Sequence, residues 1–290
     1  MPELPEVETT IRDLRKKVLG RTFVDVWSDF KRIVKKPKSF KAFKKEIAGK
    51  KIENVRRRAK FIIIDLSQNK SLLIHQRMTG HLLAGEWEKK EGEWKSDRSP
   101  LSEKVNSYIH LIFQLDDGSM IALSDLRKFT KIELWDTEEI ESLKKIKKLG
   151  PEPLKEDFTF EKFKDVLKGR KAKIKQVLMN QEVVAGIGNI YASEILFRAK
   201  VHPFKKTNKL SEKELKKIYN FIKKVLSRAI ELRGESFADW RDADGEKGFF
   251  DKERKVYQRE GEKCPRCGGI IERKKINNRS TYFCSKCQKL

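Results

Sequence analysis

Apolar residues near the start of the chain recur at intervals of three and four positions. This spacing puts them on one face of a helix and predicts a helix over residues 3–18, with apolar positions at Leu4, Val7, Ile11, Leu14 and Val18. The opening MPELPEVE also suits a helix start, because proline is favoured in the first turn and glutamate faces the positive end of the helix dipole. A second interpretation is that the terminus is itself a reagent, since removal of Met1 would leave a secondary amine on Pro2.

Short β-like runs follow the first helix, separated by turn signals such as DDG at 116–118. Many short strands at close spacing favour a β-sandwich or a barrel. The polar stretch 84–104 is expected to form a loop. We expect strands at 22–28, 60–66, 71–78, 108–115 and 131–135.

Helical spacing replaces the strand pattern from about residue 137. The two prolines and the glycine of LGPEPL at 149–154 indicate a linker. Ser211 and Glu214 have the spacing of a capping box, and the stretch 233–250, rich in Gly and Asp, is expected to be an exposed loop. We expect helices at 159–168, 171–179, 189–199 and 211–232.

The charge balance narrows the class of partner. The chain has 67 Lys and Arg against 43 Asp and Glu, a formal net charge of +24. Such an excess points to a polyanion, most simply nucleic acid, with an anionic membrane surface as the rival interpretation. The sequence contains neither a run of 18 apolar residues nor a signal peptide, which predicts a cytoplasmic protein that does not enter a membrane.

All four cysteines lie in the last 27 residues, as CPRC and CSKC. The C-x2-C…C-x2-C spacing is typical of a structural zinc site, in which a hairpin brings two pairs of thiolates to one tetrahedral ion. Two disulfides are the alternative, which a reducing cytosol disfavours. We therefore expect one zinc ion held by Cys264, Cys267, Cys284 and Cys287.

Five motifs occur in this chain in the order found in formamidopyrimidine-DNA glycosylases, bacterial enzymes that excise oxidised purines such as 8-oxoguanine. The motifs are MPELPEVE, RRRAK at 56–60, LGPEPL, GIGNIYASE at 186–194 and the four-cysteine finger. The chain resembles this family over nearly its whole length. The resemblance implies a monomeric enzyme of the bacterial cytoplasm, associated with the nucleoid, that acts on duplex DNA containing oxidised bases.

The same resemblance implies a multi-domain α+β fold. An N-terminal helix and a β-sandwich would occupy residues 1–136, followed by a linker at 137–154. A helical domain with a helix–two-turn–helix would follow at 155–235, and a lesion-capping loop with the zinc-finger hairpin at 236–290.

Catalytic roles are also implied by the resemblance. Pro2 would attack the anomeric carbon of the damaged nucleoside, and Glu3 would protonate the sugar ring oxygen, supported by Glu6. A terminal amine suits this role, because its pKa of about 7.7–8.0 leaves a usable free fraction at neutral pH. Lys60 would transfer a proton during β-elimination and Arg279 would assist δ-elimination. From residue type alone, Lys60 would more simply be a solvated lysine at a strand end.

A flipped-out base leaves a hole in the duplex that side chains must fill. Met78, Arg127 and Phe129 resemble the void-filling trio of the family, with Arg127 bonding to the orphaned cytosine. Arg127 and Phe129 would project from one face of an extended segment. Residue type alone would make Met78 and Phe129 core residues, and would make His75 a structural or phosphate-contacting histidine.

Phosphate contacts are expected from the helical domain. Lys171 and Lys175 are four positions apart and would share a helix face, next to Arg170. Asn189 follows two glycines where a helix should begin, so it is expected to be a helix cap, a phosphate contact, or both.

Several loops depart from the family pattern. Arg77 and Arg233 stand where the family has glycine, Thr130 ends a DLRKFT that usually reads DPRRFG, and Asn106 aligns with a common histidine. These loops are expected around the lesion, so base preference is the property that the likeness determines least. An endonuclease VIII-like enzyme for oxidised pyrimidines is one alternative, although that group usually begins PEGPE. A catalytically silent DNA-binding module is another, which the joint presence of the four catalytic residues disfavours.

Overall fold

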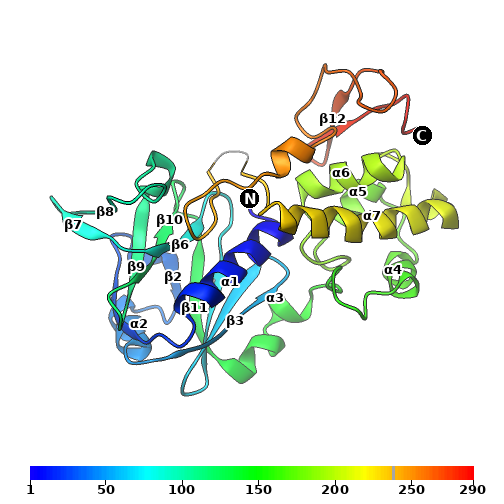
Figure 1. The fold of residues 1–290 in the computed structure, drawn as a ribbon. Coiled ribbons are helices and arrows are strands. Elements are labelled where there is room, and N and C mark those ends of the chain that lie inside the picture. Colours follow the sequence, from blue (N-terminus) through cyan, green and yellow to red (C-terminus); the bar gives the residue numbers. More distant parts are fainter. Residues whose placement is uncertain (237–238) are drawn as a thin grey trace. The chain divides into compact units, whose positions relative to one another are not determined.

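The computed structural model describes residues 1–236 and 239–290, and this part of the chain forms two compact units. The first unit consists of Met1–Lys147 and Leu232–Asp251, and the second of Lys148–Glu231 and Lys252–Leu290 (Figure 1). The segment 232–251 therefore belongs to the first unit, whereas the predicted domain boundaries divide it between the helical domain and the finger region.

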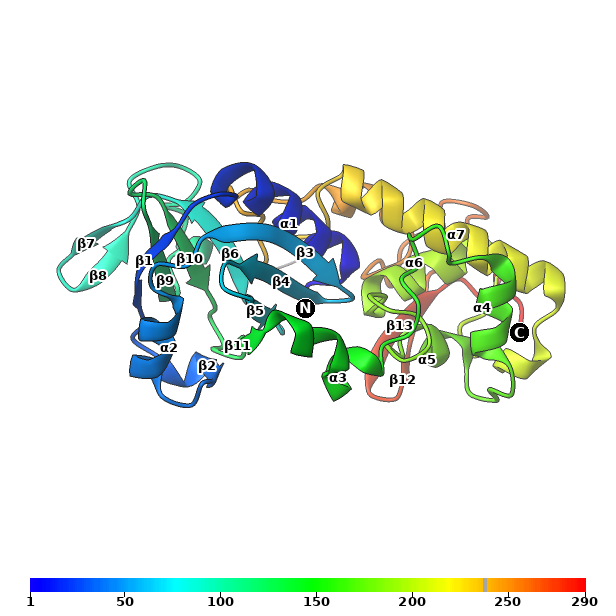
Figure 2. The ribbon, with the colours of Figure 1, turned by 90° about the horizontal axis from the view of Figure 1, so that it is seen from below.

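The first helix, α1 (Leu4–Val18), begins at almost the predicted residue. Its predicted apolar face is buried, and basic residues occupy its last turn, where they complement the helix dipole. Glu3 is the N-cap and Pro5 lies in the first turn, so Pro2 precedes the helix instead of starting it. The helix packs against β3 (Ile52–Arg58), which Figure 2 shows from below.

Two sheets form the sandwich of the first unit. One is antiparallel, in the order β1 (Phe23–Trp27), β9 (Ile109–Leu115), β10 (Met120–Ser124), β6 (His81–Gly85). The other runs β2 (Val34–Lys36), β11 (Lys131–Asp136), β5 (Lys70–His75), β4 (Phe61–Leu66), β3 (Ile52–Arg58), with only the β2–β11 pair parallel. The predicted sandwich is confirmed, and its core combines the inner faces of both sheets with the buried face of α1.

The remaining elements of the first unit are short. Two of them, β7 and β8, form a hairpin inside the stretch 84–104 that the sequence predicted as a loop. Trp94 on this hairpin packs edge-on against Trp27 at 5.8 Å, which ties it to the sandwich. These short elements are η1 (Lys31–Ile33), α2 (Phe40–Ile47), β7 (Glu88–Lys90), β8 (Glu93–Lys95), η2 (Lys104–Asn106), η3 (Thr137–Ser142) and α3 (Lys144–Lys147).

The second unit combines helices with a C-terminal hairpin. Thr159 caps α4 by accepting from the N–H of Lys162, and the predicted capping box of Ser211 and Glu214 opens α7. Asn277 and Asn278 both have positive φ and form the turn of the β12–β13 hairpin. The elements are α4 (Phe160–Leu167), α5 (Ile174–Leu178), α6 (Asn189–Ala199), η4 (Thr207–Lys209), α7 (Glu212–Glu231), β12 (Glu272–Ile276) and β13 (Arg279–Phe283), with η5 (Phe250–Glu253) at the boundary of the units.

Two predictions about these elements are wrong. Helix α5 begins at Ile174, so Lys171 lies outside it and does not share a helix face with Lys175. The strand predicted at 71–78 ends at His75, because the chain turns there and Arg77 adopts a φ of 60°. Within residues 1–236 and 239–290, no helix is both long and apolar enough to cross a lipid bilayer.

Candidate functional site

The residues at the start of the chain form a buried cluster in the first unit. Glu3, Glu6 and Lys60 are 3%, 2% and 5% exposed, and Pro2 is buried beside them. The charges of Glu3, Glu6 and Lys60 all act on the terminal amine, so these side chains lie around the amino terminus. The burial of Lys60 rules out the solvated strand-end lysine that residue type alone suggested.

Glu6 is the centre of the hydrogen bonding in this cluster. The backbone N–H of Glu3 donates to its Oε2 at 2.6 Å, and the backbone N–H of Glu235 donates to its Oε1 at 2.8 Å. Gly234 has a φ of +80°, and a Cβ there would lie 2.8 Å from Oε1 of Glu6. The chain therefore needs glycine at 234 to approach this carboxylate.

The terminal amine has an unusual environment for a charged group. In this structure the amine belongs to Met1. Burial lowers the pKa of this amine below the ordinary value of 8.0, Glu3 and Glu6 oppose the change, and Lys60 adds to it. A lower pKa increases the fraction of unprotonated amine at neutral pH. The cluster therefore places two carboxylates and a lysine close to the amino group of Met1, the residue directly before Pro2.

A second group of predicted residues lies on the turns after β5 and β10. Met78 and Phe129 are 38% and 48% exposed, so the interpretation of both as core residues is wrong. The guanidinium of Arg127 lies 4.7 Å from the centre of the Phe129 ring. Arg127 is in a turn and Lys128 has a φ of 56°, so the pair lies side by side without the extended backbone that we expected.

Asp125 organises these turns and was missed from the sequence. This buried carboxylate accepts from the hydroxyl of Thr79 at 2.5 Å and from the N–H and hydroxyl of Thr130, both at 2.8 Å. The N–H of Arg127 donates both to the same carboxylate and to Thr79. An Asp directly after an apolar strand, followed by a turn, is the available sequence signal.

His75 is held as a neutral ring. Its Nδ1 accepts from the N–H of Arg77 at 3.0 Å, and its ring packs edge-on against Phe61 at 4.8 Å. Burial lowers its pKa to about 3, with the charges of Arg77 and Lys60 acting in the same direction. The hydrogen on Nε2 remains to donate, so the structural role is present and a phosphate contact stays a prediction.

In the second unit, Lys175 is buried and bonded to the hairpin that carries Arg279. Its Nζ donates to the carbonyl of Ser280 at 3.1 Å and to the hydroxyl of Thr281 at 3.0 Å. Arg279 is exposed at the start of β13 and lines a cavity of about 190 Å³ with Lys175. Lys175 thus supports Arg279 and does not lie on an exposed track of lysines.

The other predicted phosphate contacts lie on loops and one helix end. Arg170 and Lys171, on the loop before α5, line a cavity of about 570 Å³ together with residues of α5. Asn189 is the first residue of α6, and Gly188 is its N-cap, so the interpretation of Asn189 as a cap is wrong. The Oδ1 of Asn189 is buried and has no hydrogen-bond partner among the described residues.

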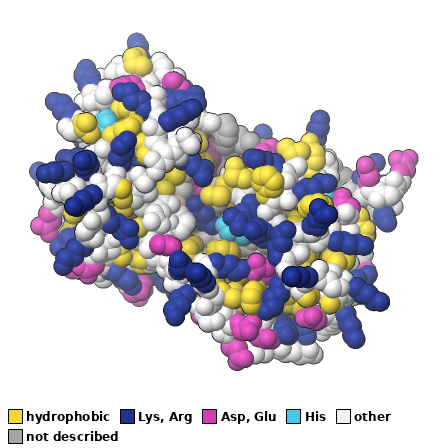
Figure 3. All heavy atoms as spheres, turned by 180° about the vertical axis from the view of Figure 1, so that it is seen from behind, with side chains coloured by type: hydrophobic (Ala, Val, Ile, Leu, Met, Phe, Trp, Pro, Cys, Tyr) yellow, Lys and Arg dark blue, Asp and Glu magenta, His cyan; other side chains and the backbone are white. Residues whose placement is uncertain are grey.

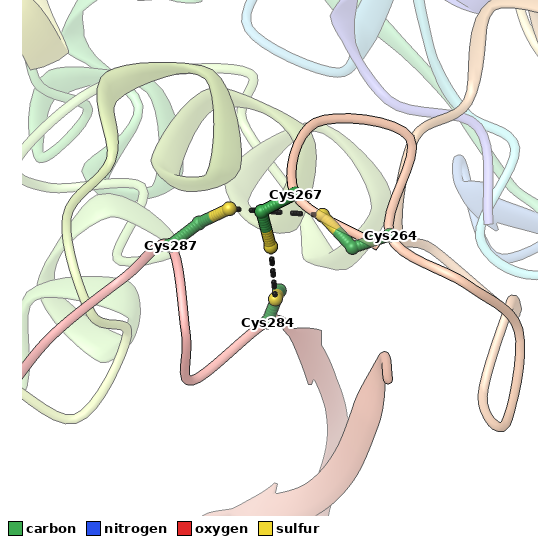
Figure 4. A group of neighbouring side chains, drawn as sticks. All are labelled: Cys264, Cys267, Cys284 and Cys287. Atoms are coloured by element: carbon green, nitrogen blue, oxygen red, sulfur yellow. Dashed lines mark hydrogen bonds between the residues drawn. The ribbon is translucent and has the colours of Figure 1, made fainter. Parts of the chain in front are cut away.

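The four cysteines converge from the loops on either side of the β12–β13 hairpin, as Figure 4 shows. Their sulfurs all lie within 4.8 Å of one another, with 3.7 Å between Cys264 and Cys287 and 3.6 Å between Cys267 and Cys284. Zinc–sulfur bonds of about 2.3 Å in a tetrahedron place the sulfurs about 3.8 Å apart, so the thiols fit one zinc ion. All four are free thiols, which excludes the disulfide alternative in this structure.

Helix α6 anchors the segment that leads into these cysteines. The buried Glu194 carboxylate accepts from the backbone N–H groups of Lys255, Val256 and Tyr257 at 2.9–3.1 Å. Arg198 pairs with the same carboxylate. Glu194 belongs to GIGNIYASE, but no sequence pattern links it to the backbone at 255–257, which lies more than sixty positions away.

Comparison with known proteins finds a match for each of the three regions. Family models match the N-terminal domain of formamidopyrimidine-DNA glycosylase over residues 1–132, its H2TH domain over 149–240, and the zinc finger found in FPG and IleRS over 261–290. The formamidopyrimidine-DNA glycosylase of Pelotomaculum thermopropionicum is 39% identical over 290 residues, covering all of both chains. The chain belongs to the formamidopyrimidine-DNA glycosylase family. The enzyme of Heliobacterium modesticaldum is also 39% identical over the whole of both chains.

Solved structures of the family agree with the fold. The Lactococcus lactis Fpg bound to DNA with an abasic site is 36% identical and has a TM-score of 0.87, over 99% of this chain and all of that one. A complex of the L. lactis enzyme with Fapy-dG DNA has a TM-score of 0.86 at 35% identity, with the same coverage. The chain is thus a DNA repair glycosylase that binds DNA, with a zinc finger whose four cysteines hold one structural zinc ion. Lys and Arg side chains are widespread on the face drawn in Figure 3, as a DNA-binding family requires.

Proposed function

We propose that this glycosylase is bifunctional: it excises oxidised purines, such as 8-oxoguanine and formamidopyrimidines, and then cleaves the abasic strand as a lyase. The observation that carries the proposal is the buried cluster at the amino terminus, where Glu3, Glu6 and Lys60 surround the terminal amine. Removal of Met1 would leave a secondary amine on Pro2. This amine would lie in the cluster, directly before Glu3, the N-cap of α1.

The first step is substitution at the anomeric carbon. The Pro2 nitrogen bonds to C1′, the glycosidic bond breaks, and its electron pair leaves with the base, which gains a proton. Glu3 protonates the ring oxygen, the sugar opens and an iminium forms between Pro2 and C1′. Glu6 supports this step by holding the backbone of Glu3.

The second step uses the iminium as an electron sink. Loss of a proton from C2′ drives β-elimination of the 3′ phosphate, with Lys60 transferring the proton, and δ-elimination then releases the 5′ phosphate with help from Arg279. Water hydrolyses the remaining iminium and frees Pro2. Lys60 is buried in the first unit, whereas Arg279 is presented by the finger of the second.

The choice of oxidised purines rests on relatives and on the turns after β5 and β10. The relatives of known structure include an L. lactis complex with Fapy-dG DNA and a MutM complex with carbocyclic 8-oxo-G DNA. Met78 and Phe129 are exposed and Arg127 lies against Phe129, which supports a role for the three in filling the space left by an extruded base. We also expect the enzyme to act as a monomer at the bacterial nucleoid.

Release of the base from matched duplexes tests this function. Oligonucleotides carrying 8-oxoguanine opposite cytosine should lose the base and the strand should break on both sides of the sugar. Preferential release of a ring-saturated pyrimidine would instead identify an endonuclease VIII-like enzyme. Tight lesion binding without release of either base would identify a non-catalytic damage-binding module.

A further inference from the structure

We propose that Arg233 is a positioning residue that fixes the 232–236 segment to α1, and that it thereby holds Glu6 and the backbone of Glu3 in place beside the nucleophile. The inference rests on the proposed function for its catalytic consequence. The arrangement itself is a feature of the first unit and can be measured without turnover. Figures 1 and 2 both draw the segment that follows α7 beside α1.

Arg233 bridges two carboxylates that are far apart in the sequence. Its Nη2 donates to Oδ2 of Asp13 on α1 at 2.7 Å, and its Nε and Nη2 donate to Oδ2 of Asp242 at 2.8 and 2.6 Å. The side chains of Asp13 and Asp242 are 5% and 0% exposed, whereas that of Arg233 is 35% exposed. Breaking such a pair from one side leaves a buried charge without its partner, which is strongly unfavourable.

The carboxylates of Asp13, Asp242 and Asp244 lie close enough together to suggest a cation site. The guanidinium of Arg233 supplies that cation, since it contacts Asp13 and Asp242 directly and lies 3.7 Å from Asp244. The cluster is therefore an internal ion network and not a metal centre.

The network connects to the catalytic cluster through two consecutive residues. Directly after Arg233, Gly234 packs against Glu6, and the N–H of Glu235 donates to the Glu6 carboxylate. Glu6 and Asp13 are seven residues apart, which places them two turns apart on the same face of α1. The segment therefore contacts one face of α1 at two residues, Asp13 and Glu6. Glu6 in turn accepts a hydrogen bond from the N–H of Glu3.

Asp242, the second partner of Arg233, is itself held in place by hydrogen bonds within the first unit. Its Oδ1 accepts from the N–H groups of Asp244 and Glu246 at 3.0 and 2.9 Å, and the carbonyl of Gly245 accepts from the side chain of Asn106 at 3.2 Å. The N–H of Ala84 on β6 donates to the carbonyl of Ala243 at 2.8 Å. The turn at 242–246 is thus joined to the sandwich, and Arg233 transmits that anchorage to α1.

The backbone conformation of Arg233 supports a specific role for its side chain. Arg233 has a φ of +58°, a left-handed conformation that disfavours residues other than glycine. The contacts of its guanidinium compensate for this strain. Arg233→Gly would relieve the strain while removing the guanidinium, so this variant should fold with the same backbone path.

The experiment compares Arg233→Gly, Asp13→Asn and the double variant with Arg98→Ala as the control. Arg98 and Arg233 both line a cavity of about 530 Å³. Arg98 pairs with Glu86 instead of with the carboxylates that bind Arg233. Hydrogen exchange of the Glu3 and Glu235 amides should accelerate about tenfold or more in the first three proteins and stay unchanged in the control. Single-turnover excision of 8-oxoguanine and borohydride trapping on a preformed abasic site should both slow about tenfold, with the DNA Kd within about twofold.

The double variant should be no slower than Arg233→Gly alone, because Arg233→Gly already removes the bond to Asp13 together with the bonds to Asp242. Arg233→Lys, which keeps the charge, should recover part of the lost rate. Unchanged amide exchange in Arg233→Gly, or additive effects in the double variant, would overturn the inference. If the wild-type protein itself failed to trap DNA, the proposed function would fail, while the exchange measurement would still decide the role of Arg233.

Discussion

The buried carboxylate of Glu6 joins two backbone amides that are far apart in the sequence: Oε2 accepts from the N–H of Glu3 at 2.6 Å, and Oε1 accepts from the N–H of Glu235 at 2.8 Å. A buried carboxylate that accepts two backbone hydrogen bonds is held in place by them. In the proposed mechanism Glu6 therefore holds the backbone next to the nucleophile.

Replacing Glu6 by Gln should slow base excision with little effect on DNA affinity. The amide keeps one acceptor but turns a donor toward a backbone N–H, which removes one charge-assisted hydrogen bond worth about 1.5–3 kcal/mol. If that energy is realised in the transition state, single-turnover excision should fall about 10- to 100-fold. Arg12→Ala is the control, because Arg12 lies on the exposed side of α1 in a pair with Glu8. Equal excision rates for Glu6→Gln and Arg12→Ala would show that Glu6 does not contribute to base excision.

An N-terminal extension should abolish excision while preserving lesion binding. The proposed nucleophile is the free amine of Pro2, and an extension converts it into an amide nitrogen whose lone pair is delocalised. The native protein treated with borohydride during turnover should be trapped on DNA, since reduction turns the iminium into a stable amine. Mass spectrometry should find the sugar remnant on the peptide that begins with Pro2. The same tag placed at the C-terminus is the control, and trapping on Lys60 would contradict the assignment.

Cys267→Ser should lose zinc and DNA binding without unfolding the sandwich. Folding of a small hairpin such as this one depends largely on its metal, and the hairpin carries Arg279. All five tryptophans lie in the first unit, so tryptophan fluorescence reports on the sandwich alone. Metal analysis should fall from one zinc per chain to almost none, with an unchanged fluorescence unfolding curve. Ser285→Ala, next to a ligand, should keep its zinc, and unchanged zinc in Cys267→Ser would disprove the four-thiolate site.

Periodicity predicted the first helix and five strands, but it missed the short apolar strands β6 and β10 as well as strands that depend on a neighbour. α1 and the apolar strand β4 were predicted within one or two residues. β3 was missed because its sequence, IENVRRR, is mostly polar, and its strand conformation comes from pairing with β4. The β7–β8 hairpin was missed for the same reason, since its contact with the sandwich is made by Trp94 against Trp27.

The site was predictable as a set of residues but not as a network. Motif likeness selected Pro2, Glu3, Glu6 and Lys60, whose grouping around the amino terminus depends on the fold. The bonds that hold this group come from Arg233 and Glu235, which are 220 and 229 positions away from their partners on α1. No local pattern encodes such distant contacts. Lys175 shows the opposite error, because four-residue spacing suggested an exposed helix face where the structure has a buried lysine.

Arg127→Ala should weaken discrimination for cytosine opposite the lesion more than it weakens lesion binding. A bidentate contact to a base edge contributes about 1–3 kcal/mol of discrimination, whereas a phosphate contact contributes affinity without sequence information. Lys128→Ala is the matched control, because it removes the same charge from the neighbouring residue, whose ammonium lies over the ring of Phe30. Excision opposite each of the four bases measures the effect. Intact opposite-base preference in Arg127→Ala would show that another residue reads the orphan base.

His81 should make the sandwich less stable in acid. The ring is 1% exposed, its Nε2 faces the side-chain oxygen of Asn106 at 3.0 Å, and burial lowers its pKa to about 4 from an ordinary 6.5. Between these values the unfolded chain binds a proton that the folded chain does not, so the free energy of unfolding falls as the pH falls from about 6.5 to about 4. A shift of this size corresponds to about 3 kcal/mol across the window.

His81→Gln should remove that slope while lowering stability at neutral pH, because glutamine does not titrate but fits the hydrogen bonds less well. Urea unfolding followed by tryptophan fluorescence at several pH values measures the first unit for both proteins. The difference between the two curves isolates His81 from the carboxylates that also titrate in this range, such as Asp13, whose pKa burial raises. The two proteins should converge as the pH approaches 4. Parallel curves would mean that His81 is protonated in the folded state, with Asn106 and the carbonyl of Thr79 accepting from both ring nitrogens.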